Sequence, residues 1–263
     1  FIVSVLEDSP ELHQSKLKGL GLHEMVLGFL RSDSEKARIY AIEYARGHAP
    51  DIAVTDLVSL ASEGQKDVRT FVIDRLSKLS PAQIGLPALL RLIGVSEAAA
   101  MAEDKIKLGF SPDHLTEEHF IMLSTGNPAQ RKFVLAFFKS AEKPIPARFY
   151  TALLDDKRCD WSSRREALEE LGKRTGKEIG PEWIKKALMD PQLQYMASNW
   201  LRQGKLAGAD LDVEWVKGLV MRPSLRGLAI DILKNRALVA PSSIGLDWLL
   251  AMARQPDENL HQF

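Results

Sequence analysis

The sequence predicts an all-α protein, an α–α superhelix built from about eight stacked two-helix repeats. Two observations predict this fold class. One polar position of a helical pattern returns every 30–33 residues, and an apolar position in a preceding helix keeps the same period. A period held over that many copies is the sequence signature of a repeat architecture. No alternation of apolar and polar residues typical of strands competes with it.

The second helix of each repeat carries the clearer pattern. We call its aligned polar position the register position, and its copies are separated by 31, 31, 31, 33, 30, 32 and 33 residues. It is occupied by Arg38, Arg69, Ala100, Arg131, Arg164, Gln194, Arg226 and Asn259. Apolar residues follow three, four and seven positions later, on one helical face. These predicted core residues are Ala41, Val72, Val134, Ala167, Ala197 and Ala229, then Ile42, Ile73, Leu135, Leu168 and Ile230, then Leu76, Phe138, Leu171, Leu201 and Leu233.

The starts of the second helices are marked by capping residues and prolines. Four positions before the register lie the good N-cap residues Ser34, Asn127, Asp160 and Asp190. Directly after that position, where the first helical turn tolerates proline, lie Pro128, Pro191, Pro223 and Pro256. We therefore expect the second helices to begin at these residues.

Five of the first helices contain an acidic residue followed by a large apolar one, and the apolar position recurs in all eight repeats. The apolar residue is Met25, Leu57, Leu89, Phe120, Phe149, Trp183, Trp215 and Trp248 in turn. Because the tryptophans share this position with other apolar residues, we expect core residues rather than a stacking platform for bases. The predicted repeats lie near 22–48, 52–80, 84–108, 116–140, 147–174, 181–203, 212–237 and 245–263, in a single array that spans 1–263.

Paired helices of this period, with "DVR" from Asp67 and "LRGLA" from Leu225 near the start of the second helix, resemble HEAT repeats. Armadillo-like repeats are a close alternative. The resemblance runs from about Leu22 to Phe263. It implies a curved solenoid whose second helices line the concave surface. It also implies binding to other proteins in most cases and to nucleic acid in some.

Composition narrows the classes of function. Lys plus Arg and Asp plus Glu both number 35, so the net charge is zero, which disfavours a dedicated nucleic-acid binder. No apolar run reaches the length that spans a bilayer, so we expect no membrane partner. A single cysteine favours a reducing, intracellular and therefore cytoplasmic setting. We expect the chain to be part of a longer protein.

Two segments contain residue types found in metal-binding or catalytic sites, but structural roles explain them more simply. "HLTEEH", His114 to His119, spaces its histidines by five residues, about 140° apart around a helix, whereas a zinc helix needs them on one face. Thr116 is instead predicted to cap a helix that carries Glu117 and Glu118 in its first turn. Cys159 lies beside Lys157 and Arg158 but has no histidine tied to it by a motif. We predict no catalytic residue, no metal and no cofactor.

The register arginines have two interpretations. They are a structural ladder, in which each arginine bridges to an acid or a helix end in the adjacent repeat, or they are a row of anion-binding cations. The sequence leaves this choice open for Arg38, Arg69, Arg131, Arg164 and Arg226.

Outward positions of the second helices give the candidate partner-binding residues. They form an acidic column, Glu43, Asp74, Glu169 and Asp231, and a basic column, Arg46, Lys139, Arg202 and Lys234. The simpler account is that Glu43–Arg46 and Asp231–Lys234 are ordinary i,i+3 ion pairs. The alternative is a groove for a partner.

The leading hypothesis is a non-enzymatic scaffold for protein partners within a larger intracellular protein. A second hypothesis is a nucleic-acid-binding domain, including a HEAT-like alkylpurine DNA glycosylase, which would need a basic concave face. A hydrolase that uses "HLTEEH" or Cys159 is a third.

Overall fold

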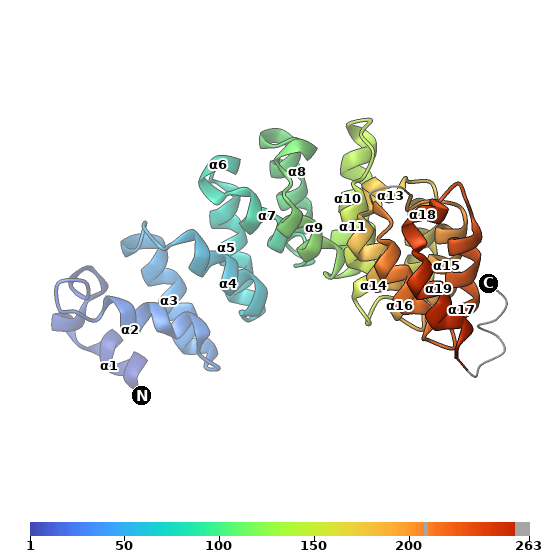
Figure 1. Cartoon of the computed structure of the whole chain (residues 1–263). Coiled ribbons are helices and arrows are strands. Elements are labelled where there is room, and N and C mark those ends of the chain that lie inside the picture. Colours follow the sequence, from blue (N-terminus) through green and yellow to red (C-terminus); the bar gives the residue numbers. More distant parts are fainter. Residues whose placement is uncertain (208–209, 256–263) are drawn as a thin grey trace. The chain divides into compact units, whose positions relative to one another are not determined.

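The computed structural model describes residues 1–207 and 210–255. All regular structure in these ranges is helical, with 19 α-helices and no strand (Figure 1). The chain divides into two compact units, Phe1–Ile145 and Pro146–Phe263. None of the described helices combines the length and the apolar character needed to cross a membrane.

The first unit is a row of helix pairs. After α1 (Ile2–Asp8) and two 3-10 turns, Pro10–Leu12 and Gln14–Lys16, each pair joins a shorter first helix to a second helix. The pairs are α2 (His23–Gly28), extended by the 3-10 turn η3 (Phe29–Arg31), with α3 (Glu35–His48); α4 (Val54–Glu63) with α5 (Lys66–Ser77); α7 (Leu86–Leu92) with α8 (Ala99–Gly109); and α9 (Glu117–Ser124) with α10 (Pro128–Ser140). First helices pack on first helices, α4 on α7 and α7 on α9, and second helices on second helices, α3 on α5 and α8 on α10. The unit therefore has two layers of helices.

The second unit continues with the same kind of pair. These pairs are α11 (Ala147–Asp155) with α12 (Trp161–Gly172), α14 (Pro181–Met189) with α15 (Gln194–Arg202), and α16 (Val213–Val220) with α17 (Arg226–Lys234). The second helices α15 and α17 pack on each other, and α19 (Leu246–Ala253) follows as a further first helix. The second helix predicted for the last repeat, with Pro256 and Asn259, lies outside the described residues.

Three linkers contain a one-turn helix that the sequence analysis did not predict. These helices are α6 (Pro81–Ile84), α13 (Gly176–Ile179) and α18 (Pro241–Ile244). Each ends in Ile-Gly, and the glycines Gly85, Gly180 and Gly245 have φ of 82°, 97° and 81°. Glycine adopts positive φ without the penalty that a Cβ brings. The recurrent Ile-Gly pair was the signal that could have revealed these turns.

The predicted core positions are confirmed in part. The core residues predicted three positions after the register are all fully buried, from Ala41 to Ala229, and those predicted seven positions after it are buried as well. Four positions after it, only Ile42 is buried, whereas Ile73, Leu135, Leu168 and Ile230 are half-buried. Large side chains two and six positions after the register are buried instead: Phe71, Phe133, Leu228, Tyr44, Phe137, Trp200 and Ile232. The buried stripe is displaced from the prediction because each second helix also packs on neighbouring second helices.

The predicted helix starts hold at some second helices and are wrong at others. Asn127 caps α10, accepting the N–H of Gln130 at 3.1 Å, and Asp160 caps α12, accepting that of Ser163 at 3.0 Å. By contrast, α15 and α17 begin at the register position itself, after a non-helical turn that contains Pro191 or Pro223.

The apolar position of the first helices is buried from Leu57 to Trp183, but not at every copy. Met25 is 40% exposed, and its neighbour Val26 is buried instead. Trp215 and Trp248 are half-buried, so their prediction as core residues is only partly right. A lysine from the preceding first helix covers each ring: Lys185 Nζ lies 5.6 Å from the Trp215 centroid and Lys217 Nζ 5.7 Å from that of Trp248.

Candidate functional site

The register side chains bind the carbonyl groups at the end of the first helix of their own repeat. Their donor–acceptor distances are 3.0 and 2.9 Å from Arg38 Nη1 to Ser32 O and Asp33 O, 2.8 Å from Arg131 Nη1 to Gly126 O, 3.5 Å from Arg164 Nη2 to Leu154 O, 3.2 Å from Gln194 Nε2 to Leu188 O, and 3.0 Å from Arg226 Nε to Val220 O. The last carbonyls of a helix have no partner within it and form the negative end of its dipole. These side chains therefore satisfy carbonyl groups at or just after a helix terminus, and the arginines among them also place a positive charge at its negative end.

Two register arginines also reach an acid of the next repeat. Arg38 Nε donates to both carboxylate oxygens of Asp67, at 3.0 and 2.9 Å, and Arg38 is only 9% exposed. Arg69 Nη2 lies 3.0 Å from Glu97 Oε1. The structure thus favours the structural ladder over the row of anion-binding cations for these arginines. It differs from the prediction in one respect, because the capped helix end belongs to the same repeat and only the acid belongs to the next.

A second set of cations joins consecutive second helices. Arg75 on α5 donates to Ala45 O at 3.2 Å and to Ala49 O at 2.6 Å, at the end of α3. Lys105 on α8 likewise donates to the Ser77 and Leu79 carbonyls after α5, and Lys205 after α15 to those of Gly172 and Arg174 after α12. Burial lowers the pKa of Lys205. These contacts tie each repeat to the one before it.

The acidic and basic columns are exposed on the second helices, as predicted, but their pairing differs. Asp231 pairs across repeats with Arg202, at 3.4 Å. Glu43 and Arg46 do not form the expected i,i+3 pair, and the Arg46 guanidinium lies over the Phe71 ring, 5.7 Å from its centroid. Asp74 and Glu169 pair within their own helices, with Lys78 at 2.7 Å and with Arg165 at 2.9 Å. The two columns therefore do not form one continuous site.

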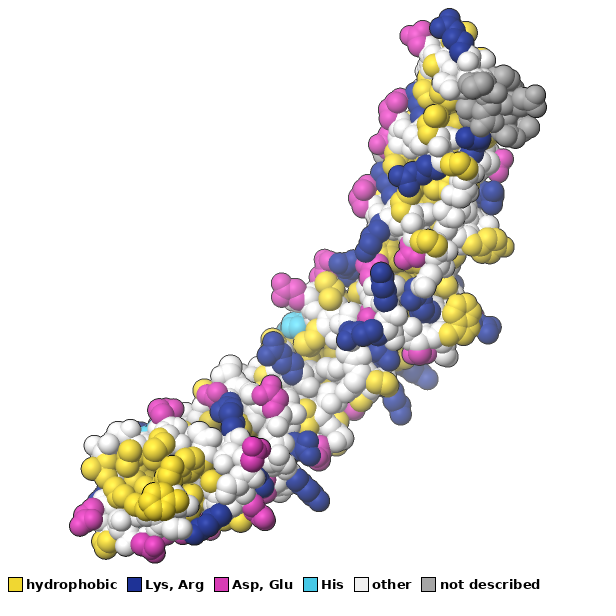
Figure 2. Space-filling view, turned by 90° about the horizontal axis from the view of Figure 1, so that it is seen from below, with side chains coloured by type: hydrophobic (Ala, Val, Ile, Leu, Met, Phe, Trp, Pro, Cys, Tyr) yellow, Lys and Arg dark blue, Asp and Glu magenta, His cyan; other side chains and the backbone are white. Residues whose placement is uncertain are grey.

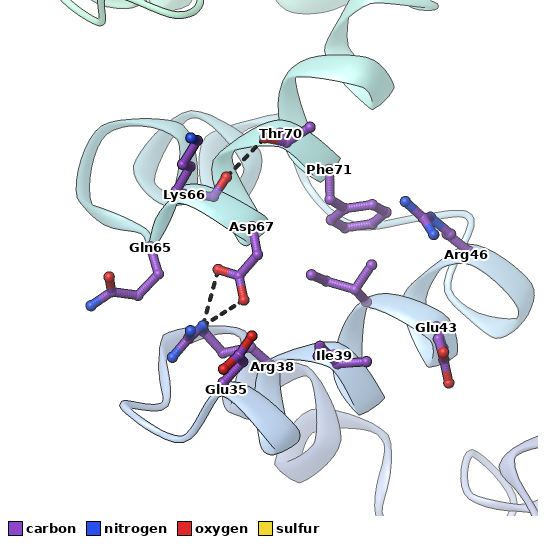
Figure 3. Close-up of a pocket in the computed structure, with 11 residues that line it drawn as sticks. Glu35, Arg38, Ile39, Glu43, Arg46, Gln65, Lys66, Asp67, Thr70 and Phe71 are labelled. Carbon is purple, nitrogen blue, oxygen red and sulfur yellow. Dashed lines mark hydrogen bonds and ion pairs between the residues drawn. The ribbon is translucent and has the colours of Figure 1, made fainter.

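Glu43 and Arg46 line a groove between α3 and α5, which we call the α3–α5 groove (Figure 3). Its volume is about 590 Å³, within the range of sites that hold a small molecule or a few side chains. Ile39, 46% exposed, lies on its apolar side together with Ile42 and Phe71. The Arg38–Asp67 ion pair lies toward one end, and Arg46 lies beside Phe71 toward the other.

Charged side chains of both signs surround this apolar surface. Glu35 and Glu43 belong to α3, Arg46 to the end of the same helix, and Lys66 to the start of α5. Within the part of the chain that the structure describes, none of the four forms an ion pair. The α3–α5 groove therefore offers two carboxylates and two cations to a ligand, around one exposed apolar side chain, Ile39, that lies beside the buried Ile42 and Phe71.

The histidines of "HLTEEH" take part in local capping. The Nδ1 atom of His114 accepts the N–H of Ser111 at 3.1 Å, and that of His119 accepts the N–H of Thr116 at 3.0 Å. The helix α9 begins directly after Thr116, as predicted. Cys159 is buried, with Sγ 3.6 Å from the Asp160 carbonyl oxygen. Residues 1–207 and 210–255 contain no group of three or more His, Cys, Asp or Glu side chains arranged to hold a metal ion.

The residues of the candidate site are identified from the geometry of this chain alone, and no relative supplies a role for them. Comparison of the chain with protein-family models, with curated proteins and with solved structures found no match.

Proposed function

We propose that the chain is a HEAT-like α-solenoid that serves as a non-enzymatic scaffold for protein partners within a larger intracellular protein. The α3–α5 groove carries this proposal. It lies on exposed faces of two consecutive second helices, the surface that HEAT-like proteins use for binding. Ile39 is accessible in this groove, and an apolar side chain of a partner that covers it would be stabilised because both leave water.

The charges around the α3–α5 groove favour a polypeptide over nucleic acid. Glu35 and Glu43 would repel phosphate, whereas a polypeptide can meet them with Lys or Arg and meet Arg46 and Lys66 with Asp or Glu. Figure 2 supports this preference, because Lys and Arg alternate with Asp and Glu on the face shown instead of forming a basic strip. Arg38, Arg131 and Arg226 bind carbonyl groups, so the register arginines do not form a continuous row open to phosphate.

A random peptide library displayed on phage, selected against the full chain, tests this function. We expect binding peptides whose affinity falls about tenfold or more in the variant Ile39→Arg, because that change places a charge in the centre of the apolar surface. Hydrogen–deuterium exchange of the complex should show protection in α3 and α5.

A matched control is Ile121→Arg, which makes the same change at a 38% exposed isoleucine on the first helix α9. This variant should bind the peptides as the wild type does. Peptides that bind Ile39→Arg and wild type equally well, or protection confined to other helices, would contradict the proposal for this groove.

A further inference from the structure

A second groove lies in the other unit, and its charges are of a different kind. We call it the α12–α15 groove, because α11, α12, α14 and the turn that leads into α15 line it. Its volume is about 610 Å³. Three cations line it, Lys157, Arg164 and Lys186, together with two acids, Asp155 and Asp190.

Within the described residues, two of the three cations that line this groove have no carboxylate partner. Only Lys186 is neutralised, by Asp155 at 2.9 Å. Arg164 has a single long contact, 3.5 Å to the Leu154 carbonyl, and exposed Lys157 forms no ion pair within the described residues. Arg222, from the next repeat, places Nη1 2.9 Å from the sulfur of Met189, which lines the groove. The surface therefore has a surplus of positive charge.

Asp190 does not remove this surplus. Its Oδ1 accepts the N–H of Gln192 at 2.8 Å, so this carboxylate serves the turn before α15. Three cations without a carboxylate partner, Lys157, Arg164 and Arg222, thus remain beside one acid without a cation. The groove is complementary to negative charge.

Two exposed aromatic side chains lie close in the sequence to residues that line the α12–α15 groove. Trp161, 76% exposed, is the first residue of α12 and lies one turn before Arg164. Tyr195, 80% exposed, is the second residue of α15 and lies three positions after Gln192, another lining residue. Repeat packing does not require an aromatic there, because α5 has Lys66 and Thr70 at the corresponding positions. Exposed Trp, Tyr and Arg side chains are the residue types that dominate binding energy in protein interfaces.

We infer that the α12–α15 groove binds an acidic segment of a protein partner that carries aromatic or aliphatic residues. Its carboxylates would pair with Lys157, Arg164 and Arg222, and its apolar side chains would cover Trp161 and Tyr195. This surface is separate from the α3–α5 groove, so the scaffold can hold two segments of different charge.

The phage selection on the full chain tests this inference through the composition of the peptides. We expect a class enriched in Asp and Glu next to Trp, Phe or Leu. Its affinity should fall about tenfold in Lys157→Glu and in Trp161→Ala, and should weaken as salt concentration rises. Matched controls in the same unit are Lys177→Glu on α13 and Leu246→Ala, a 70% exposed leucine on α19, and neither should change binding.

Four outcomes would overturn the inference. No acidic class emerges, or acidic peptides bind Lys157→Glu and wild type equally, or their binding is lost only in Ile39→Arg, which would assign them to the α3–α5 groove and leave the proposed function intact. The fourth outcome uses a second probe, oligothymidylate. If it binds more tightly than any peptide and Lys157→Glu abolishes that binding, the surface belongs to single-stranded nucleic acid instead.

Discussion

A cation near the start of a helix is disfavoured by the dipole of that helix, yet the register position holds arginine in five of eight copies. The structure explains the recurrence by the direction of the side chain. Arg38, Arg131 and Arg226 reach the carboxyl end of the first helix, where the dipole has the opposite sign. One arginine thus joins the two helices of a repeat, and an acid such as Asp67 extends the link to the next repeat.

Arg38 should contribute strongly to stability because it is almost fully buried and forms four hydrogen bonds. We expect Arg38→Ala to lower the free energy of unfolding by about 2–4 kcal/mol, because Asp67 and two carbonyl groups lose their partner. Urea denaturation measures this change. Arg165→Ala removes an exposed pair with Glu169, 72% and 59% exposed, and should cost less than about 1 kcal/mol. Equal losses in the two variants would refute the structural role of Arg38.

One-turn helices shape the path of three linkers between helix pairs. In two of the three one-turn helices, Ser80 and Thr175 form a capping box with the residue three positions later, and a glycine of positive φ then starts the next first helix. The glycine redirects the chain from the one-turn helix into the next pair. The same short element recurs in both units, at α6 and at α13 and α18.

Gly180 should therefore resist substitution even though no neighbouring atom lies within 4 Å of an added Cβ. We expect Gly180→Ala to destabilise the protein by about 1–3 kcal/mol, because its φ of 97° is strained for any residue with a side chain. Gly218→Ala is the contrasting variant, inside α16 and equally uncrowded. It should raise stability by up to about 1 kcal/mol, through the better helix propensity of alanine. Thermal denaturation of both variants, with changes of opposite sign, would confirm the argument.

Within each unit, contacts run between consecutive repeats and between the two helices of one repeat. Such packing makes stability a sum over repeats and their neighbour interfaces. The period also continues across the division between the units, since the register positions Arg131 and Arg164 are 33 residues apart. This continuity supports the proposal that all the repeats form one solenoid.

Small-angle X-ray scattering tests the proposed solenoid. A compact globule of 263 residues would have a radius of gyration of about 18 Å. We expect a clearly larger value, together with a pair-distance distribution that has a long tail, because repeats that stack in one direction extend the molecule. A radius close to that of the compact globule would mean that the units fold back on each other, which the solenoid proposal forbids.

The period of the sequence was enough to predict the helix pairs and the most buried positions. Ala41, Val72 and Ala229 are small apolar residues at a position that is fully buried in six of the repeats. The N-caps Asn127 and Thr116 could also be predicted from the sequence, because a capping interaction involves residues only a few positions apart. Such features depend on residues a few positions apart, which periodicity and capping rules describe.

The tertiary structure decided which groups the charged and aromatic side chains meet. Arg38 binds an acid 29 residues away, and Arg202 pairs with Asp231 at the same separation, so neither partner follows from helical spacing within one repeat. The coverage of Trp215 and Trp248 by lysines and both grooves likewise depend on how consecutive helices are placed. A helical period fixes the face on which a residue lies, whereas the distance and angle between helices fix what that face contacts.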